Sequence, residues 1–229
     1  YDHMGALPYI RRAFPEVIVY GSTHCQEILQ RPNAKVLMKK LGTAARDLYR
    51  PDSKEEIPVD DLAVDIALKD GDMVSLGNET IQAIEAKGHT DCSMAYALEP
   101  DGILFTSEST GIVEAGLAIN TPILKSFADA MTSLEKCRGY GAKYICLPHF
   151  GLIPQDFNEE YWMQFQQGCE DRIQMVREMK KEGLDADQML ERYRDRYWDP
   201  IMEQEQPIEA FLINAKNIIK AALRALDEK

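Results

Sequence analysis

Imidazole and carboxylate side chains follow short apolar runs in this sequence. The chain has four histidines; His89 and His149 stand near the ends of such runs, and His3 stands beside Asp2 at the start of the sequence. Glu108 follows the apolar residues 103–105 in the same way. Imidazole nitrogens and carboxylate oxygens are protein ligands for Zn²⁺, Fe and Mn. Because residues that follow neighbouring strands can meet at one edge of a sheet, this pattern predicts a metal site built from distant segments.

A set of short strands must position these side chains. Runs of β-branched and apolar residues between turn signals predict strands at residues 17–20, 73–76, 78–85, 93–98, 102–106 and 144–147. The first of these is expected to be a buried parallel strand. Residues 99–102 read Glu-Pro-Asp-Gly, which predicts a hairpin turn. This hairpin would bring Glu108 out beside His89.

Helices are expected between and after these strands. Residues 5–14 and 34–48 have helical composition. Thr121 followed by Pro122 has the residue types of a helix cap and first helical position, so a helix is expected to begin there. The region in which helices alternate with strands therefore predicts a mixed α/β domain over residues 1–155.

The last third of the chain has a different character. After Pro154 nearly every residue reads as helix, which predicts a helical cap or extension over residues 156–229. Its aromatic residues are expected to pack against the α/β domain or to wall a pocket for an apolar group. In the second interpretation Trp162 and Tyr193 bind substrate. The amphipathic stripe of the final helix predicts either packing or a homodimer interface.

Four motifs together resemble the signature of a known family. Asp2-His3 followed by Gly5 is similar to the second half of H-x-H-x-D-H, and residues 88–93 (Gly-His-Thr-Asp-Cys-Ser) are similar to G-H-T-x-x-S. Residues 104–108 (Leu-Phe-Thr-Ser-Glu) are similar to L-F-T-G-D, and residues 148–151 (Pro-His-Phe-Gly) to the motif of the final histidine. In this order, the motifs resemble those of the metallo-β-lactamase fold superfamily.

The resemblance implies a fold, a metal centre and a reaction. The fold would be α/β, an αββα four-layer sandwich, and it would bind two divalent transition-metal ions, zinc first and iron or manganese as alternatives. His89 would join one ion with the two histidines of H-x-H, and Glu108 would bridge the ions. Asp2, His3 and His149 would hold the second ion, and Asp2 is also expected to be catalytic. A water or hydroxide between the ions would be the nucleophile.

The sequence departs from the family pattern at two points. The first two histidines of H-x-H-x-D-H do not appear before Tyr1, and we expect preceding polypeptide to supply them. Glu108 stands where the family has Asp, and its side chain is longer by one methylene. A bridging carboxylate can adapt to this length, with an effect on metal spacing, metal identity or activity.

Other interpretations of the same residues stay open. His89-x-x-Cys92 and Cys146-x-x-His149 could together form a structural Cys₂His₂ zinc site. That site would leave Asp2, His3 and Glu108 without a role. Cys92 is expected to be a buried thiol, and His24 a structural or exposed histidine.

Composition restricts the partners. The chain carries 26 basic and 38 acidic residues, a formal net charge of −12, and a nucleic-acid-binding protein usually shows a basic patch. We therefore expect a small-molecule substrate, with no binding to nucleic acid or membrane. No apolar run approaches the length of a membrane span. The five cysteines include no C-x-x-C pair, which fits reduced thiols and a cytoplasmic location.

These observations favour a metal-dependent hydrolase that attacks a carboxylic ester, thioester or lactone. Phosphodiesterases share the same fold and are one alternative. A di-iron oxidoreductase that reduces oxygen or nitric oxide is another, although its relatives carry a flavin-binding domain where this chain has helices. A third alternative is a non-catalytic binding protein with a degraded site, which the presence of Glu108 makes conceivable.

Overall fold

The computed structural model describes residues 1–114 and 117–227. These residues form two compact units, one comprising Tyr1–Leu68 with Tyr193–Ile213 and the other Lys69–Arg192 with Asn214–Lys229. The expected domain boundary between residues 155 and 156 is not tested by these two units and stays a prediction. Residues 228 and 229 of the predicted extension lie outside the described residues.

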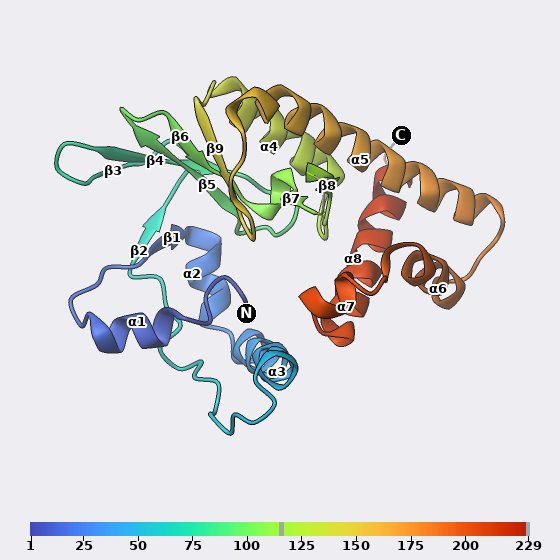
Figure 1. Ribbon diagram of the computed structural model, residues 1–229, viewed down its shortest axis with the longest axis horizontal. Coiled ribbons are helices and arrows are strands. Elements are labelled where there is room, and N and C mark those ends of the chain that lie inside the picture. The colour runs from blue at the N-terminus through green and yellow to red at the C-terminus, as the bar shows by residue number, and fades with distance from the viewer. Residues whose placement is uncertain (115–116, 228–229) are drawn as a thin grey trace. The chain divides into compact units, whose positions relative to one another are not determined.

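The first unit consists mainly of helices and contains a two-stranded sheet (Figure 1). Its elements within the first 68 residues are α1 (Leu7–Ala13), β1 (Tyr20–Ser22), α2 (Thr23–Leu29), α3 (Pro32–Tyr49) and β2 (Ile66–Leu68). β1 and β2 pair in parallel. The hydroxyl of Ser22 caps α2 by accepting the N–H of Cys25 at 3.1 Å. Leu29, Leu62 and Val64 form a buried apolar cluster in this unit.

The strand predicted at residues 17–20 is only partly confirmed. A parallel strand forms, but it begins at Tyr20 and runs to Ser22. Ile18 and Tyr20 are exposed, so the prediction of a buried strand is wrong for residues 17–20. Asp65 accepts the N–H of Val19 at 2.8 Å, which takes that backbone group out of the strand pairing.

The second unit contains a six-stranded sheet in the order β10-β9-β6-β5-β4-β3. Its strands are β3 (Met73–Ser75), β4 (Thr80–Glu85), β5 (Met94–Glu99), β6 (Ile103–Phe105), β9 (Tyr144–Leu147) and β10 (Gly151–Leu152). β6 and β9 are parallel and the other neighbours are antiparallel. The predicted hairpin at residues 99–102 is confirmed, because it joins β5 to β6.

Two long helices lie along this sheet (Figure 1). They are α4 (Phe127–Gly139) and α5 (Asn158–Lys181). The row Ala97, Leu104 and Ile145, which crosses three strands at one register position, is buried. Between β6 and α4 the chain forms the 3₁₀ helix η1 (Glu108–Thr110) and the short hairpin of β7 (Ile112–Val113) and β8 (Ile119–Asn120).

The predicted start of α4 is wrong. The helix begins at Phe127, and its cap is Ser126, whose hydroxyl accepts the N–H of Asp129 at 3.1 Å. Thr121 is buried outside the helix and accepts a hydrogen bond from the guanidinium of Arg172. A tertiary partner has therefore replaced the capping role that residue types alone suggested.

The C-terminal region is mostly helical, as predicted. η3 (Gln155–Phe157) precedes α5, and α6 (Ala186–Tyr197), α7 (Met202–Glu205) and α8 (Ile208–Asp227) follow it. The apolar stripe of α8 is buried, with Ala215, Ile218 and Ala222 almost without exposure. Among the described residues no helix has the length and apolar character needed to span a membrane. The chain thus has a mixed α/β fold followed by a mostly helical region.

Candidate metal centre

His89 is held by a glycine loop that packs directly on α4. β4 ends at Glu85, and Gly88 has a φ of +138°, a conformation that side-chain-bearing residues rarely adopt. A Cβ on Gly88 would lie 2.7 Å from the Cβ of Ala130. The carbonyl of Gly88 accepts the N–H groups of Lys125 at 2.9 Å and Ser126 at 3.2 Å. The absence of a side chain at Gly88 therefore allows the loop to reach the start of α4.

Two further contacts fix the orientation of the His89 imidazole. The backbone N–H of His89 donates to the hydroxyl of Ser109 at 3.0 Å. The ring Nδ1 lies 2.6 Å from the carbonyl oxygen of Pro122. A carbonyl oxygen can only accept, so Nδ1 carries the proton in this contact. In a neutral imidazole the lone pair is then on Nε2, the atom that faces Glu108.

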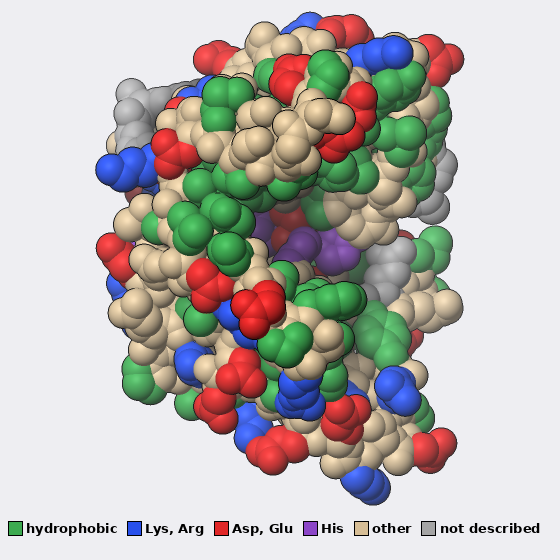
Figure 2. Space-filling model, turned by 90° about the vertical axis from the view of Figure 1, so that its left-hand side faces the viewer, with side chains coloured by type: hydrophobic (Ala, Val, Ile, Leu, Met, Phe, Trp, Pro, Cys, Tyr) green, Lys and Arg blue, Asp and Glu red, His purple; other side chains and the backbone are tan. Residues whose placement is uncertain are grey.

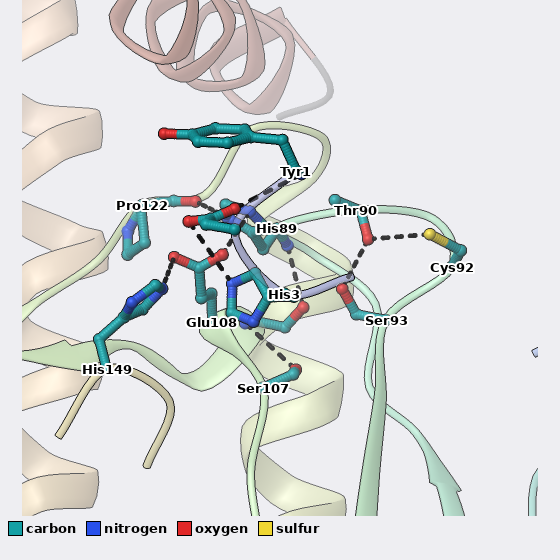
Figure 3. Close-up of polar contacts among 12 residues, drawn as sticks. Tyr1, His3, His89, Thr90, Cys92, Ser93, Ser107, Glu108, Pro122 and His149 are labelled. Carbon is teal, nitrogen blue, oxygen red and sulfur yellow. Dashed lines mark hydrogen bonds and ion pairs between the residues drawn. The ribbon is translucent and has the colours of Figure 1, made fainter. Parts of the chain in front are cut away.

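The Glu108 carboxylate faces two imidazoles, one with each of its oxygens (Figure 3). Oε2 lies 2.8 Å from Nε2 of His89, and Oε1 lies 3.5 Å from Nε2 of His149. The side chain is only 14% exposed. Glu108 opens η1, whose cap is the hydroxyl of Ser107. The predicted proximity of Glu108 to His89 is confirmed by this geometry.

His149 lies in the turn between β9 and β10. Its φ is +64°, in the left-handed region that few non-glycine residues occupy. The side chain is 40% exposed, and histidine side chains are visible on the surface drawn in Figure 2. Residues with such backbone strain concentrate at functional sites. The turn therefore directs an accessible imidazole toward the Glu108 carboxylate.

This donor set fits a divalent transition metal. A neutral His89 with its proton on Nδ1 points a lone pair at a carboxylate oxygen 2.8 Å away. Two lone pairs at that distance repel each other unless a positive charge lies between them. Either a proton or a metal ion supplies that charge, and nitrogen and carboxylate ligands suit Zn²⁺, Fe and Mn. The carbonyl partner of His89 also matches the outer shell of metal-binding histidines.

Asp2 and His3 belong to the first unit and lie just before α1. Oδ2 of Asp2 is 4.0 Å from Nε2 of His3. Both side chains are exposed, with 42% and 46% of their surface accessible. Their assignment as ligands of the same centre as His149 stays a prediction.

The two aromatic residues expected to bind substrate are buried. Trp162 and Tyr193 each expose 3% of their surface. Trp162 packs on Tyr161 with ring centroids 4.3 Å apart, and Tyr193 packs on Tyr197 at 4.6 Å. These contacts favour the packing interpretation of both residues, and direct substrate binding by them stays a prediction.

The alternative Cys₂His₂ site finds no support in the structure. Over residues 1–114 and 117–227, no cluster of three or more metal-ligand side chains includes Cys92 or Cys146. The thiol of Cys92 lies 3.3 Å from the hydroxyl of Thr90, and it is partly exposed, so its expected burial is incomplete. His24 is 39% exposed on α2 and lies 3.5 Å from Glu27, as expected for a histidine outside the site.

Sequence reasoning missed the residues that support the candidate ligands. Pro122 acts through its backbone carbonyl and Ser109 through a hydroxyl 20 positions from His89. Tyr161 donates to the carbonyl of Thr110, two residues after Glu108, at 2.9 Å. Burial raises the pKa of Tyr161 far above its usual range, so its hydroxyl remains protonated. No local motif signals these partners, because each contact joins distant segments.

Comparison with known proteins agrees with this geometry. The family model of the metallo-beta-lactamase superfamily matches residues 1–149. Atrochrysone carboxyl ACP thioesterase from Aspergillus fumigatus is 22% identical over 159 residues, which are 69% of this chain and 38% of that protein. The chain therefore spans well under half of the thioesterase.

Solved structures show the same fold. A metallo-beta-lactamase superfamily protein from the archaeon Sulfolobus tokodaii has a TM-score of 0.56 and 21% identity, with coverage of 71% of this chain and 62% of that one. A metallo-beta-lactamase family protein from Thermus thermophilus has a TM-score of 0.59 and 15% identity, covering 93% of this chain and 67% of that one. Proteins of this superfamily are mostly hydrolases, and the fold typically binds metal ions. The chain belongs to the metallo-beta-lactamase superfamily.

Proposed function

We propose that this protein is a metal-dependent hydrolase that acts on a carboxylic ester, thioester or lactone. The observation that carries the proposal is the Glu108 carboxylate, which presents one oxygen to Nε2 of His89 and the other to Nε2 of His149. This arrangement suits a carboxylate that bridges two ions. One similar protein is named a thioesterase, which supports acyl substrates as the first choice.

Each residue of the centre has a distinct part in the proposal. His89 offers Nε2 because Pro122 holds its Nδ1 proton. His149 contributes a second imidazole, and Asp2 and His3 are proposed as further ligands on the basis of their motif positions. When bound, two divalent ions, zinc first, would act as Lewis acids and lower the pKa of water at the site. Asp2 would also orient the attacking water.

The exposure of the two imidazoles favours a catalytic over a structural metal site. Structural zinc sites are closed by four protein ligands, whereas catalytic sites leave a position open. His89 is 13% exposed and His149 is 40% exposed, so the centre is enclosed on one side and accessible on the other. A substrate carbonyl can therefore approach from the side of His149.

The proposal is tested by metal analysis combined with a substrate panel. The purified protein is dialysed against Zn²⁺, Fe²⁺ or Mn²⁺, its metal content is measured, and hydrolysis of an aryl ester, an acyl thioester, a lactone and an aryl phosphodiester is compared. We expect the wild type to bind metal and to hydrolyse acyl substrates. Both the metal content and the rate of hydrolysis should fall in His89→Ala. His24→Ala is the matched control, because His24 is exposed on α2, and it should behave as the wild type.

Each outcome of the panel has a distinct meaning. Hydrolysis of the phosphodiester alone would replace the proposed substrate class with the phosphodiesterase alternative. Metal binding without any hydrolysis would favour a binding protein or an oxidoreductase. Equal metal content in wild type and His89→Ala would remove the basis of the proposal.

A further inference from the structure

One face of α5 holds the segment that precedes Pro122. Gln164, Gly168 and Arg172 are spaced by four residues and therefore lie along one stripe of the helix. The side-chain oxygen of Gln164 accepts the N–H of Ile119 at 3.2 Å. A Cβ on Gly168 would lie 2.8 Å from Cγ2 of Thr121, so α5 approaches this segment closely at the glycine.

Arg172 forms the third contact of this stripe, and it is a buried cation. Only 6% of its surface is exposed. Its Nε donates to the hydroxyl of Thr121 at 3.0 Å, and its Nη2 donates to the side-chain oxygen of Asn120. Burying a guanidinium costs free energy unless its N–H groups are hydrogen-bonded. The planar fork of arginine also fixes the directions of both acceptors.

The fixed segment continues directly into the partner of His89. Thr121 is followed by Pro122, whose ring restricts φ and whose carbonyl lies 2.6 Å from Nδ1 of His89. Few torsions separate the Thr121 hydroxyl, held by Arg172, from that carbonyl. A shift of Thr121 therefore moves the acceptor that orients the His89 imidazole.

We propose that Arg172 is a positioning residue for the metal centre: it holds Asn120 and Thr121 so that the Pro122 carbonyl fixes the orientation of the His89 imidazole. Nε2 is thereby held in place to bind a metal ion. The role of Nε2 as a ligand rests on the proposed function, whereas the orientation of the imidazole does not. Arg172 contacts neither substrate nor metal in this proposal.

The orientation of the imidazole is tested in crystals of the metal-free protein. The distance from Nδ1 of His89 to the Pro122 carbonyl oxygen, 2.6 Å here, is measured in the wild type and in the variants. We expect the wild type to keep this contact, and Arg172→Met to lose it or to show the imidazole in more than one rotamer. Val176→Ala is the matched control, because Val176 is a buried residue of α5 with 1% exposure. It should lose stability and keep the wild-type contact.

Zinc affinity, measured by competition with a chelating dye, provides the second measurement. Loss of an outer-shell partner typically weakens metal binding by roughly 10–100-fold, and we expect Arg172→Met to fall in this range. Arg172→Lys should recover part of the affinity, because one donor can still reach an acceptor. Thr121→Val removes the same hydrogen bond with little change of shape and replaces Arg172→Met if that variant does not fold.

The possible results separate the two proposals. A wild-type contact between His89 and Pro122 in both Arg172→Met and Thr121→Val would overturn the positioning role. Loss of the same contact in Val176→Ala would also overturn it, because the effect would then reflect general destabilisation. A wild-type protein that binds no metal would refute the proposed function, and the orientation of His89 would still decide the role of Arg172.

Discussion

Replacement of Gly88 by Ala tests whether the close packing of the His89 loop on α4 positions the imidazole. Gly88 has a φ of +138°, and a Cβ there would lie 2.7 Å from the Cβ, 2.8 Å from the Cα and 3.0 Å from the N of Ala130. Two of these three atoms belong to the backbone of α4, so a side-chain rotation cannot relieve the contact. The loop must move away from the helix instead.

The magnitude follows from two separate costs. A side chain in a sparsely populated backbone conformation costs roughly 1–3 kcal/mol. Overpacking by one methyl group costs roughly 1–3 kcal/mol more, so Gly88→Ala should lower the free energy of unfolding by roughly 2–6 kcal/mol. Because His89 is the next residue, its displacement should also weaken metal binding.

Urea unfolding and metal titration measure these two effects. Gly71→Ala is the control, because Gly71 has a φ of +85° and nothing within 4 Å of its added Cβ. It carries the backbone cost without the contact and lies far along the chain from the ligands. If Gly88→Ala destabilises no more than Gly71→Ala, or binds metal as the wild type does, the packing argument is refuted.

Three further predictions concern the site and its support. Glu108→Gln keeps the shape of the side chain and removes its charge. Metal affinity measured with a chelator should therefore fall by more than roughly 100-fold, which exceeds the usual effect of losing an outer-shell partner. Unchanged affinity would contradict a bridging carboxylate. Tyr161→Phe leaves the buried carbonyl of Thr110 without its donor at 2.9 Å and should cost roughly 1–2 kcal/mol in urea unfolding. Burial raises the pKa of Cys137 and Cys169 to about 12 from an ordinary 9.0. Because the thiols of the unfolded chain ionise at lower pH than the folded ones, the contribution of these two groups to the free energy of unfolding is fully present below pH 9. It should fall between pH 9 and 12 by about 1.4 kcal/mol per thiol for each pH unit. A double Cys→Ala variant with the same alkaline slope as the wild type would contradict that assignment.

The sequence predicted the strands that precede the candidate ligands better than it predicted the start of α4. Strand positions follow from alternation and turn residues, which are local, and β4, β5, β6 and β9 all formed where expected. Thr121 and Pro122 have the residue types of a helix start, but the Thr121 hydroxyl bonds to Arg172. Local propensity was overridden by a contact 51 positions away.

The candidate ligands of the second unit were also predictable, whereas the residues that support them were not. His89, Glu108 and His149 follow strands and match family motifs, so their residue types and order carried a signal. Pro122 contributes only a backbone carbonyl, a group that every residue has. Its role depends on the path of the chain between β8 and α4, which no local pattern specifies.

At position 149 the backbone conformation and the side-chain chemistry favour different residue types. At a φ of +64° glycine or asparagine would fit with less strain, yet neither offers an imidazole. Directed evolution for heat resistance alone would therefore be drawn to Gly or Asn at residue 149. Under the proposed function, the same library screened for hydrolysis would return to His, and this position in the turn between β9 and β10 would then be a trade-off between stability and activity.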